Sequence, residues 1–514
     1  MTYRRRQTCG RLVEIHLLIH LSTSADASVD VKGGITRPGH AGLIRYAFSS
    51  CTDCAVNLNA RPNIYKTLKD FSYQSIENGG LVKFWVGPTL HYMITDTEDA
   101  EVILKSQLAK TTAYALLGSF IGKSTLNAPV PIWKYHRKIL MPAFTSKMME
   151  SYFPTFVAKS RTLVEKLDEQ VNKGEFQLFP YMSAYELAIV CETTFGVNVS
   201  CQEDPNHPFL VQVEIMMEIT SERIFNILQH PEWMFKLSPQ YAKFCKARQT
   251  VNEFILKIVE TKREEIKAKR RTNPEGKEID VTESKIPSFL ELVLNMEKDI
   301  KYTDTELMQE LIALTLAGTD TSAISLSFFF ELMSKYPDVQ EKVYQELHDV
   351  FSDSTRSLAK EDIPKLQYLD RVLKESLRLY GPSALIARTV EQETKLPSGH
   401  TLPAGCDADI SIYGIHRDPR HWGPDAETFD PDRFLPGKYD NIQPCSYLPF
   451  SNGPRNCPGY HFGTTTLKIA ISDVLRKFKI VAEPLKSRVP NLEAKFDILT
   501  KPLHGVCIAL ERRK

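Results

Sequence analysis

The chain has 514 residues, of which 42% are hydrophobic and 25% are charged, a composition typical of globular proteins rather than of collagenous or disordered ones. Its 64 Lys and Arg residues balance 63 Asp and Glu residues, so the net charge is +1, which argues against a nucleic-acid-binding protein. The 10 cysteines are too few for a disulfide scaffold.

The first 58 residues differ in character from the rest of the chain. Several arginines precede a short apolar run, residues 12–21, which is interrupted by Glu14. The run is much shorter than the about 20 apolar residues that a membrane-spanning helix needs. It is compatible with a poor secretory signal or with an organelle transit peptide. We interpret residues 1–58 as a leader or disordered extension and residues 59–514 as one domain.

The next predicted elements are two strands and a long helical region. Residues 81–86 and 90–94 are β-type runs on either side of Gly87-Pro88, which predicts a hairpin. A helix is predicted at 97–106, and helical periodicity then dominates from about residue 132 to about residue 380. Within this region lies a long apolar stretch, residues 311–330, which contains a single charge.

That apolar stretch is long enough to cross a membrane, to form a core helix or to serve a functional site. Thr303 and Glu306 form a capping-box signature, so we predict one helix over 304–335, about 48 Å long at about 1.5 Å per residue. Gly318, Asp320 and Thr321 stand at its middle. Glycine inside a helix costs about 1 kcal/mol, and buried polar groups must be hydrogen-bonded. We therefore favour a helix that serves a site.

Beyond residue 380 the helices give way to short strands and loops rich in Pro and Gly. A last helix is predicted at about 459–477. Short β-type runs end the chain at 478–482, 496–499 and 506–510. The predicted class is mostly α with small β-sheets.

The most informative segment runs from Phe450 to Gly459 and contains Cys457 just before the last helix. A helix N-terminus favours a thiolate over a thiol. A lone thiolate without neighbouring Cys or His does not make a zinc or iron–sulfur site, but it suits the axial position of a haem iron. For an isolated cysteine, a buried thiol in a Gly/Pro turn is the simpler interpretation.

This segment resembles the haem-ligating loop of the cytochrome P450 family, F-x-x-G-x-R-x-C-x-G, at every fixed position. Other motifs of the family occur in this chain: W-x-x-x-R at 133–137, A-G-T-D-T-S at 317–322, E-x-x-R at 375–378 and F-D-P-D-R-F at 429–434. The resemblance covers about residues 59–514 and implies the cytochrome P450 fold, an α+β fold with a long central helix over a buried haem. Its character is closest to the animal clan that contains fatty-acid ω-hydroxylases and many insect enzymes.

The resemblance also implies a role for individual residues. It implies haem b with Cys457 as axial thiolate and metal ligand, and Asp320 and Thr321 as a proton relay on the other side of the haem. Residues implied to surround the cofactor are Trp133, Arg137, Gly318, Arg388, Phe450, Arg455 and Gly459; of these, the tryptophan and arginines would face the propionates, and Gly318 would leave room for dioxygen. Glu375, Arg378 and Arg433 would form a buried charge network that holds the loop leading to Cys457.

The haem is expected to be bound non-covalently. Many fatty-acid ω-hydroxylases have a glutamate immediately before the central-helix glycine, and that carboxylate can become ester-linked to a haem methyl. Ala317 stands at the matching position here. The nearest upstream acid, Glu310, lies about 10 Å away along the helix axis.

The implied reaction is monooxygenation of an apolar substrate such as a fatty acid, hormone, terpenoid, odorant or xenobiotic. Electrons would come from a separate NADPH–cytochrome P450 reductase, with cytochrome b5 as a further partner, at a face that includes Lys134, Lys138 and Arg455. The segments expected to line the substrate pocket, near 112–128, 209–226 and 383–388, are mostly apolar. A haem-thiolate isomerase or dehydratase, or a silent haem-binding protein, is the alternative, against which the Asp320–Thr321 pair argues.

The expected location is the cytosolic face of the endoplasmic reticulum membrane, held there by apolar surface around the substrate entrance. A mitochondrial location is the alternative.

Overall fold

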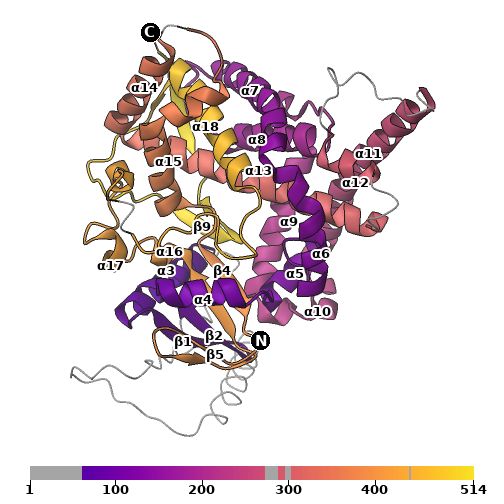
Figure 1. Ribbon diagram of the computed structural model, residues 1–514, viewed down its shortest axis with the longest axis vertical. Coiled ribbons are helices and arrows are strands. Elements are labelled where there is room, and N and C mark those ends of the chain that lie inside the picture. Colours follow the sequence, from indigo (N-terminus) through magenta and orange to yellow (C-terminus); the bar gives the residue numbers. More distant parts are fainter. Residues whose placement is uncertain (1–60, 273–286, 296–301, 353, 439–441, 514) are drawn as a thin grey trace, which may run out of the picture. The chain divides into compact units, whose positions relative to one another are not determined.

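The described part of the chain is mostly helical and contains four small sheets, of which the one formed by β9 (Ala494–Asp497) and β10 (Leu499–Pro502) lies near the centre of the view in Figure 1. The computed structural model describes residues 61–272, 287–295, 302–352, 354–438 and 442–513. The expected leader, residues 1–58, lies outside the described residues. Among those that are described, the predicted class of mostly α with small β-sheets is confirmed.

The helices follow one another along the chain as α3 Arg61–Glu77, α4 Thr97–Ser106, α5 Thr112–Ile121, α6 Val130–Leu140, α7 Ser146–Asp168, α8 Phe179–Thr194, α9 Pro208–Phe225, α10 Glu232–Lys236, α11 Pro239–Thr272, α12 Phe289–Asn295, α13 Asp304–Lys335, α14 Pro337–Phe351, α15 Gln367–Tyr380, α16 Ile412–Ile415, α17 Pro419–Trp422 and α18 Tyr460–Lys477. Short 3₁₀ turns are η1 Met141–Phe144, η2 Cys201–Glu203, η3 Ile227–Gln229, η4 Lys360–Lys365 and η5 Pro431–Phe434. The strands are β1 Leu81–Val86, β2 Thr89–Ile94, β3 Phe176–Gln177, β4 Leu385–Thr389, β5 Thr394–Lys395, β6 Thr401–Leu402, β7 Asp407–Ser411, β8 Phe478–Val481, β9 Ala494–Asp497, β10 Leu499–Pro502 and β11 Cys507–Arg512.

Helix α13 is the predicted long helix and has the predicted bounds. Thr303 and Glu306 form the expected capping box at its start, with the Glu306 N–H donating to Thr303 Oγ1 at 3.2 Å. The most apolar part of the helix is 78% buried within the protein, which is the behaviour of a core helix rather than a lipid-facing one. It packs most extensively on α8 and also contacts α15 and α18 (Figure 1).

The main core surrounds the C-terminal half of α13. Three consecutive aromatic side chains, Phe328, Phe329 and Phe330, are fully buried there among residues of α7, α15 and α18. Burying one such side chain contributes about 1.5–3 kcal/mol. This packing holds the middle of α13 in a fixed position relative to the start of α18. Cys457 lies in the loop just before α18.

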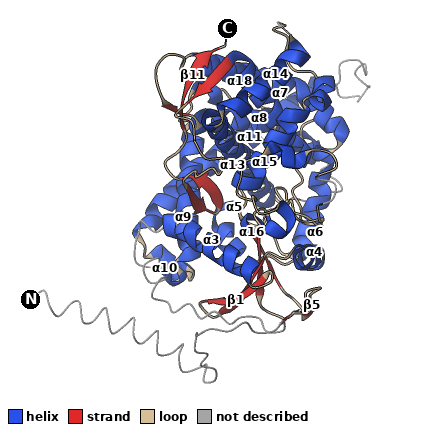
Figure 2. Ribbon diagram, turned by 90° about the vertical axis from the view of Figure 1, so that its left-hand side faces the viewer, coloured by secondary structure: helices blue, strands red, loops and turns tan. Residues whose placement is uncertain are grey.

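The largest sheet is four-stranded, in the order β1-β2-β7-β4. The predicted hairpin is present, with Gly87 at a φ of +57° in its turn. Strand β2 then pairs in parallel with β7, and β7 pairs antiparallel with β4. In Figure 2, β1 and β11 lie at opposite ends of the view, with most of the helices between them. Strand β4 carries Arg388, which is buried.

The predicted single strand at 496–499 is wrong. The chain reverses there, because Ile498 adopts a φ of +65° between β9 and β10, which form an antiparallel hairpin. The turn contains no glycine, so the sequence gives no turn signal there and residues 496–499 are typical of a continuous strand. The hairpin contacts α9 through β9 and α13 through β10.

Candidate functional site

The loop before α18 is closed by backbone hydrogen bonding. The Cys457 N–H donates to the Phe450 carbonyl at 3.0 Å. Gly453 has a φ of +75°, and a Cβ atom there would lie 2.2 Å from the Leu104 carbonyl oxygen of α4. Glycine is therefore required at this position for both conformation and space. Phe450 itself packs edge-to-face on Tyr460 at the start of α18, with ring centroids 4.8 Å apart.

Gly459 contributes to the loop through its backbone N–H rather than through a special conformation. Its φ is −88°, and a Cβ atom would meet only ordinary contacts at 3.8 Å, so neither positive φ nor close approach requires glycine here. Its backbone N–H donates to the Cys457 sulfur. This hydrogen bond from the start of α18 stabilises negative charge on the sulfur.

The Cys457 thiol is accessible, yet burial raises its pKa. The Gly459 N–H and the Arg137 guanidinium lower the pKa but do not outweigh burial. The start of the helix therefore acts in the expected direction, but burial opposes it and has the larger effect on the pKa. A bound metal cation deprotonates a coordinating thiol outright. The Cys457 sulfur is accessible at its surface but has protein atoms packed closely around it. Such a sulfur is suited to coordinate a metal that is enclosed by the protein.

A cluster of three cations lies beside this loop. Arg388 and Arg455 are 1% and 8% exposed. Lys110 is the third member: the residue before it, Ala109, accepts a hydrogen bond at 3.1 Å from the N–H of Thr389, which follows Arg388 on β4. Burial and then the neighbouring Arg388 lower the pKa of Arg455 to about 10. Burial, followed by Arg388 and Arg455, holds the pKa of Lys110 well below its ordinary value.

The cations of this cluster have unused donors. Arg388 Nε and Arg455 Nε and Nη1 are buried without a hydrogen-bond partner, while Arg455 Nη2 donates to the Ala128 carbonyl at 2.8 Å. Like charges buried together with free donors call for an anion. The two carboxylates of a haem meet that need, so the residues present fit the group. Lys110 was missed from the sequence because a lone lysine in a loop carries no signal.

Two residues of α6 reach the same region by different contacts. Trp133 is buried beneath the Arg455 guanidinium, whose carbon lies 4.5 Å from the ring centroid. Arg137 instead donates to the Asn456 carbonyl at 3.0 Å and to its side-chain oxygen at 2.9 Å. Arg137 thus holds the Cys457 loop, whereas Trp133 orients the cation cluster.

The structure brings Glu375, Arg378 and Arg433 together. Arg378 makes a two-pronged ion pair with Glu375, at 2.7 and 2.8 Å, and both side chains are 0% exposed. Arg433 Nε lies 3.6 Å from Glu375. Arg378 also donates to backbone carbonyls of the segment that leads to the Cys457 loop: His416 at 2.6 Å, Ala426 at 2.7 Å and Thr428 at 3.2 Å.

His416 extends this network to the loop. Its Nδ1 donates to the Arg378 carbonyl at 2.9 Å, and its Nε2 accepts from the Leu448 N–H at 2.8 Å. Burial lowers the pKa of His416 to about 3, so the ring is neutral. The histidine links α15 to the residues just before Phe450, a connection that its place in the sequence does not reveal.

The middle of α13 has one accessible edge. Ala317 is exposed and Thr321, one turn later, is partly exposed, although Leu316, Thr319, Asp320 and Ser322 are buried. Thr321 Oγ1 donates to the Ala317 carbonyl at 2.6 Å. A Cβ atom at Gly318 would lie 2.7 Å from Val190 of α8. Gly318 therefore allows α8 to pack closely on α13.

Asp320 does not pair directly with Thr321. Its Oδ2 lies 3.3 Å from Lys501 Nζ on β10, and both groups are buried. Consecutive helical residues point about 100° apart, so one side chain can face β10 while the next lies on the accessible edge. Lys501 was missed from the sequence, because it lies far from Asp320 along the chain.

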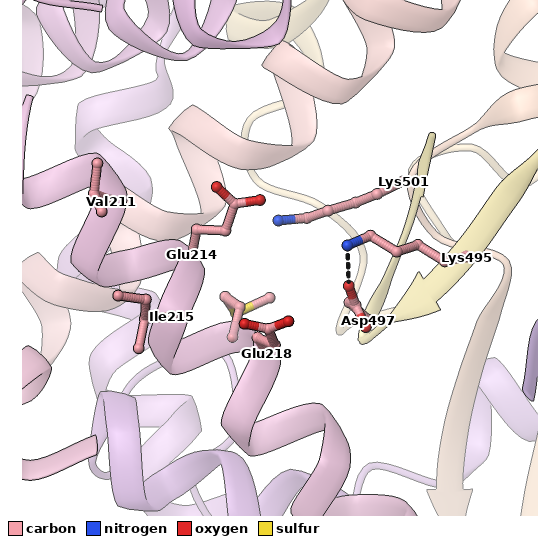
Figure 3. A pocket seen from close by; sticks show the side chains of 8 residues that line it. Val211, Glu214, Ile215, Glu218, Lys495, Asp497 and Lys501 are labelled. Carbon is pink, nitrogen blue, oxygen red and sulfur yellow. Dashed lines mark ion pairs between the residues drawn. The ribbon is translucent and has the colours of Figure 1, made fainter. Parts of the chain in front are cut away.

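A cavity of about 160 Å³ lies where α9 faces the β9–β10 hairpin (Figure 3). Its lining residues are Val211, Glu214, Ile215, Met217, Glu218, Lys495, Asp497 and Lys501. Residues 209–226 were expected to provide an apolar wall. In this cavity Val211, Ile215 and Met217 of α9 are apolar, whereas Glu214 and Glu218 turn toward the hairpin and face its charged side chains.

Comparisons with known proteins agree with these features. The family model described as Cytochrome P450 matches residues 56–508. The chain is similar to "Cytochrome P450 4c21" of Blattella germanica, with 32% identity over 436 residues, covering 84% of this chain and 86% of the relative. It is likewise similar to "Cytochrome P450 4V2" of Homo sapiens, with 32% identity over 443 residues, 84% of this chain and 82% of the relative. The solved cytochrome P450DA heme domain superposes with a TM-score of 0.73 at 21% identity, covering 90% of this chain and 95% of that one, which shows a shared fold.

Proposed function

This chain belongs to the cytochrome P450 family and is a monooxygenase, and from that premise we propose that Cys457 is the axial thiolate of a haem b. The observation that carries the assignment is the accessible Cys457 sulfur beside a buried, unsatisfied cation cluster. When bound, the haem supplies an iron that activates dioxygen, and the thiolate favours O–O cleavage. The absorption spectrum of the reduced, carbon monoxide-treated protein, compared with that of a Cys457 variant, tests the assignment.

The cation cluster binds the propionates in this proposal. Lys110, Arg388 and Arg455 would donate to the two carboxylates, and Trp133 would keep the Arg455 guanidinium in its orientation. Each ion pair offsets the burial and the repulsion from Arg388 that now lower the pKa of Arg455. Arg137 contributes indirectly, by fixing Asn456 next to Cys457. Glu375, Arg378 and Arg433 have a structural role, because they hold the chain that leads into the loop.

Thr321 and Asp320 are the proposed proton-transfer residues. Thr321 has the hydroxyl on the accessible edge of α13, where it can donate a proton through Oγ1 while accepting another. Asp320, the residue directly before Thr321, provides a carboxylate on the adjacent face of α13. Because each now bonds elsewhere, proton transfer between them requires a bridging water or a side-chain rotation.

Thr321→Ala should lower product formation by about 10²-fold, the lower limit for a positioned proton donor, while NADPH consumption continues. The electrons would then leave as peroxide or water. Haem content should stay at the wild-type level, because Thr321 makes its hydrogen bond within its own helix. Thr321→Ser, which keeps the hydroxyl, is the matched control. Product formed per NADPH consumed is the measurement, and an unchanged ratio in the alanine variant would contradict the relay.

The haem of this chain is proposed to be non-covalent. Ala317 has no carboxylate, and Glu310 is occupied: its carboxylate accepts from the Thr125 N–H at 2.8 Å and lies 3.4 Å from His136 Nδ1. We expect all of the haem to pass into acidified organic solvent. Ala317→Glu, incubated under turnover, is the positive control. Absorbance of the protein phase measures retained haem, and haem that stayed with the wild-type chain would contradict the proposal.

The substrate is proposed to be a small apolar molecule, and the electron donor a separate NADPH–cytochrome P450 reductase with cytochrome b5 as a further partner. Lys134 and Lys138 are exposed on α6, whose Arg137 contacts the Cys457 loop, so a donor that docks there lies near the sulfur. Arg455 was expected at this face but is buried, and so it is not a docking residue.

We propose attachment to the cytosolic face of the endoplasmic reticulum membrane through an apolar patch. A Cβ atom at Gly87 would lie 3.4 Å from Ile227, so the β1–β2 turn and η3 are neighbours. The large exposed apolar side chains around them are Trp85, Val86, Ile227, Leu228, Trp233 and Leu237. Exposed tryptophan and leucine side chains gathered in one place favour an interfacial position at a lipid surface.

A further inference from the structure

Lys501 forms a buried ion pair with the carboxylate at the middle of α13. The Lys501 Nζ to Asp320 Oδ2 distance is 3.3 Å, and each side chain is 6% exposed. A buried charge that loses its only partner is strongly destabilised, so each group constrains the other. Helix α13 and strand β10 are in contact, which brings these distant residues together.

The ammonium group of Lys501 also lines the cavity between α9 and the β9–β10 hairpin. In Figure 3, Lys501 extends from its strand toward Glu214, while Lys495 pairs with Asp497 at 3.0 Å. Burial lowers the pKa of Lys501, but nearby carboxylates outweigh it and raise the pKa above its ordinary value. In order of effect these carboxylates are Asp320, Glu214 and Asp497. Lys501 is therefore charged and lies between the cavity and Asp320.

We propose that Lys501 is a positioning residue for proton transfer, which holds the Asp320 carboxylate toward the cavity so that Asp320 takes up protons from solvent there. The inference rests on the proposed role of Asp320. In this step an O–H bond of a hydronium ion in the cavity breaks and an O–H bond on Asp320 forms, while Lys501 keeps its three protons. Lys501 is not the proton source, because a lysine ammonium is about 10⁶-fold less acidic than an aspartic acid in ordinary surroundings.

The position of the pair explains why the cavity is the entry point. Asp320 is buried in the middle of α13, and its ion-pair partner Lys501 lines the cavity. Glu214, which is exposed on α9, attracts cations such as hydronium to the same place.

The test is a double-mutant cycle of Lys501→Met and Asp320→Asn in the haem-containing enzyme, with product formed per NADPH consumed as the first readout. We expect Lys501→Met to lower this ratio by about tenfold, less than the about 10² expected for loss of a proton donor. In the Asp320→Asn background the same change should have no further effect. Lys501→Arg should restore most of the ratio, because it retains the charge. Lys479→Met, at an exposed position on β8, is the matched control and should behave as the wild type.

A second readout does not depend on turnover. The free energies of urea unfolding of the four proteins in the cycle, measured on the resting enzyme, should be non-additive, because Lys501→Met leaves Asp320 buried without its partner. If that single variant does not fold, the double variant still does, since it leaves no unpaired charge, and it is compared with Asp320→Asn alone.

Three outcomes would overturn the inference. An unchanged ratio in Lys501→Met, with a lowered ratio in Asp320→Asn, removes Lys501 and leaves the proposed relay intact. A further loss when Lys501→Met is added to Asp320→Asn shows that Lys501 acts independently of Asp320. An unchanged ratio in Asp320→Asn removes the relay itself, and the positioning role with it.

Discussion

Replacing Cys457 with alanine is expected to abolish both the red-shifted absorption of the reduced carbon monoxide complex and all product formation. The sulfur is the one soft, anionic ligand offered by the loop, and the Gly459 N–H and Arg137 lie where they stabilise its charge. Alanine cannot coordinate a metal. The measurement is the absorption difference spectrum at equal protein concentration, together with haem content.

The matched control for Cys457→Ala is Cys445→Ala. Cys445 is buried in the same region and has a thiol, but it accepts a hydrogen bond from Asn452 at 2.9 Å and is not accessible. It should keep the wild-type spectrum. A Cys457→Ala protein that retained that spectrum and its turnover would show that the ligand has been assigned to the wrong residue.

Arg378→Ala is expected to destabilise the protein by about 3–5 kcal/mol, the cost of breaking a buried ion pair by removing one partner. Glu375 would be left fully buried, with only the Asp430 N–H at 2.8 Å and the more distant Arg433 as partners. The carbonyls of His416 and Ala426 would also lose their donor. This cost is a large share of the about 5–15 kcal/mol that stabilises a typical folded protein.

Urea unfolding followed by circular dichroism measures the effect of Arg378→Ala, and haem content reports on the Cys457 loop. Arg433→Ala is the comparison. Its side chain lies 3.6 Å from Glu375, pairs with the exposed Asp425 and donates to the Trp422 carbonyl at 2.6 Å, so its loss should cost less than that of Arg378, about 1–3 kcal/mol. Equal, small effects of the two substitutions would contradict a buried network centred on Arg378.

Local chemistry explains which elements were predictable. The bounds of α13 follow from the Thr303–Glu306 capping box and the length of its apolar stretch, both of which lie within neighbouring residues. The first hairpin follows from Gly87, whose φ of +57° few other residues adopt. Where the local signal was absent the prediction failed. The β9–β10 turn places Ile498 at positive φ, a conformation that a β-branched residue rarely adopts.

The sequence by itself determined the family-like loop, the order of the helices and the spacing that puts Glu375 and Arg378 on one helix face, because these depend on residues close together in the chain. Only the tertiary structure decided the partners of the charged groups. Lys501 reaches Asp320, and Lys110 joins Arg388 and Arg455, across large distances in sequence. The physical reason is that charges act through space, so burial and packing between distant elements, which no local pattern encodes, select the pair that forms.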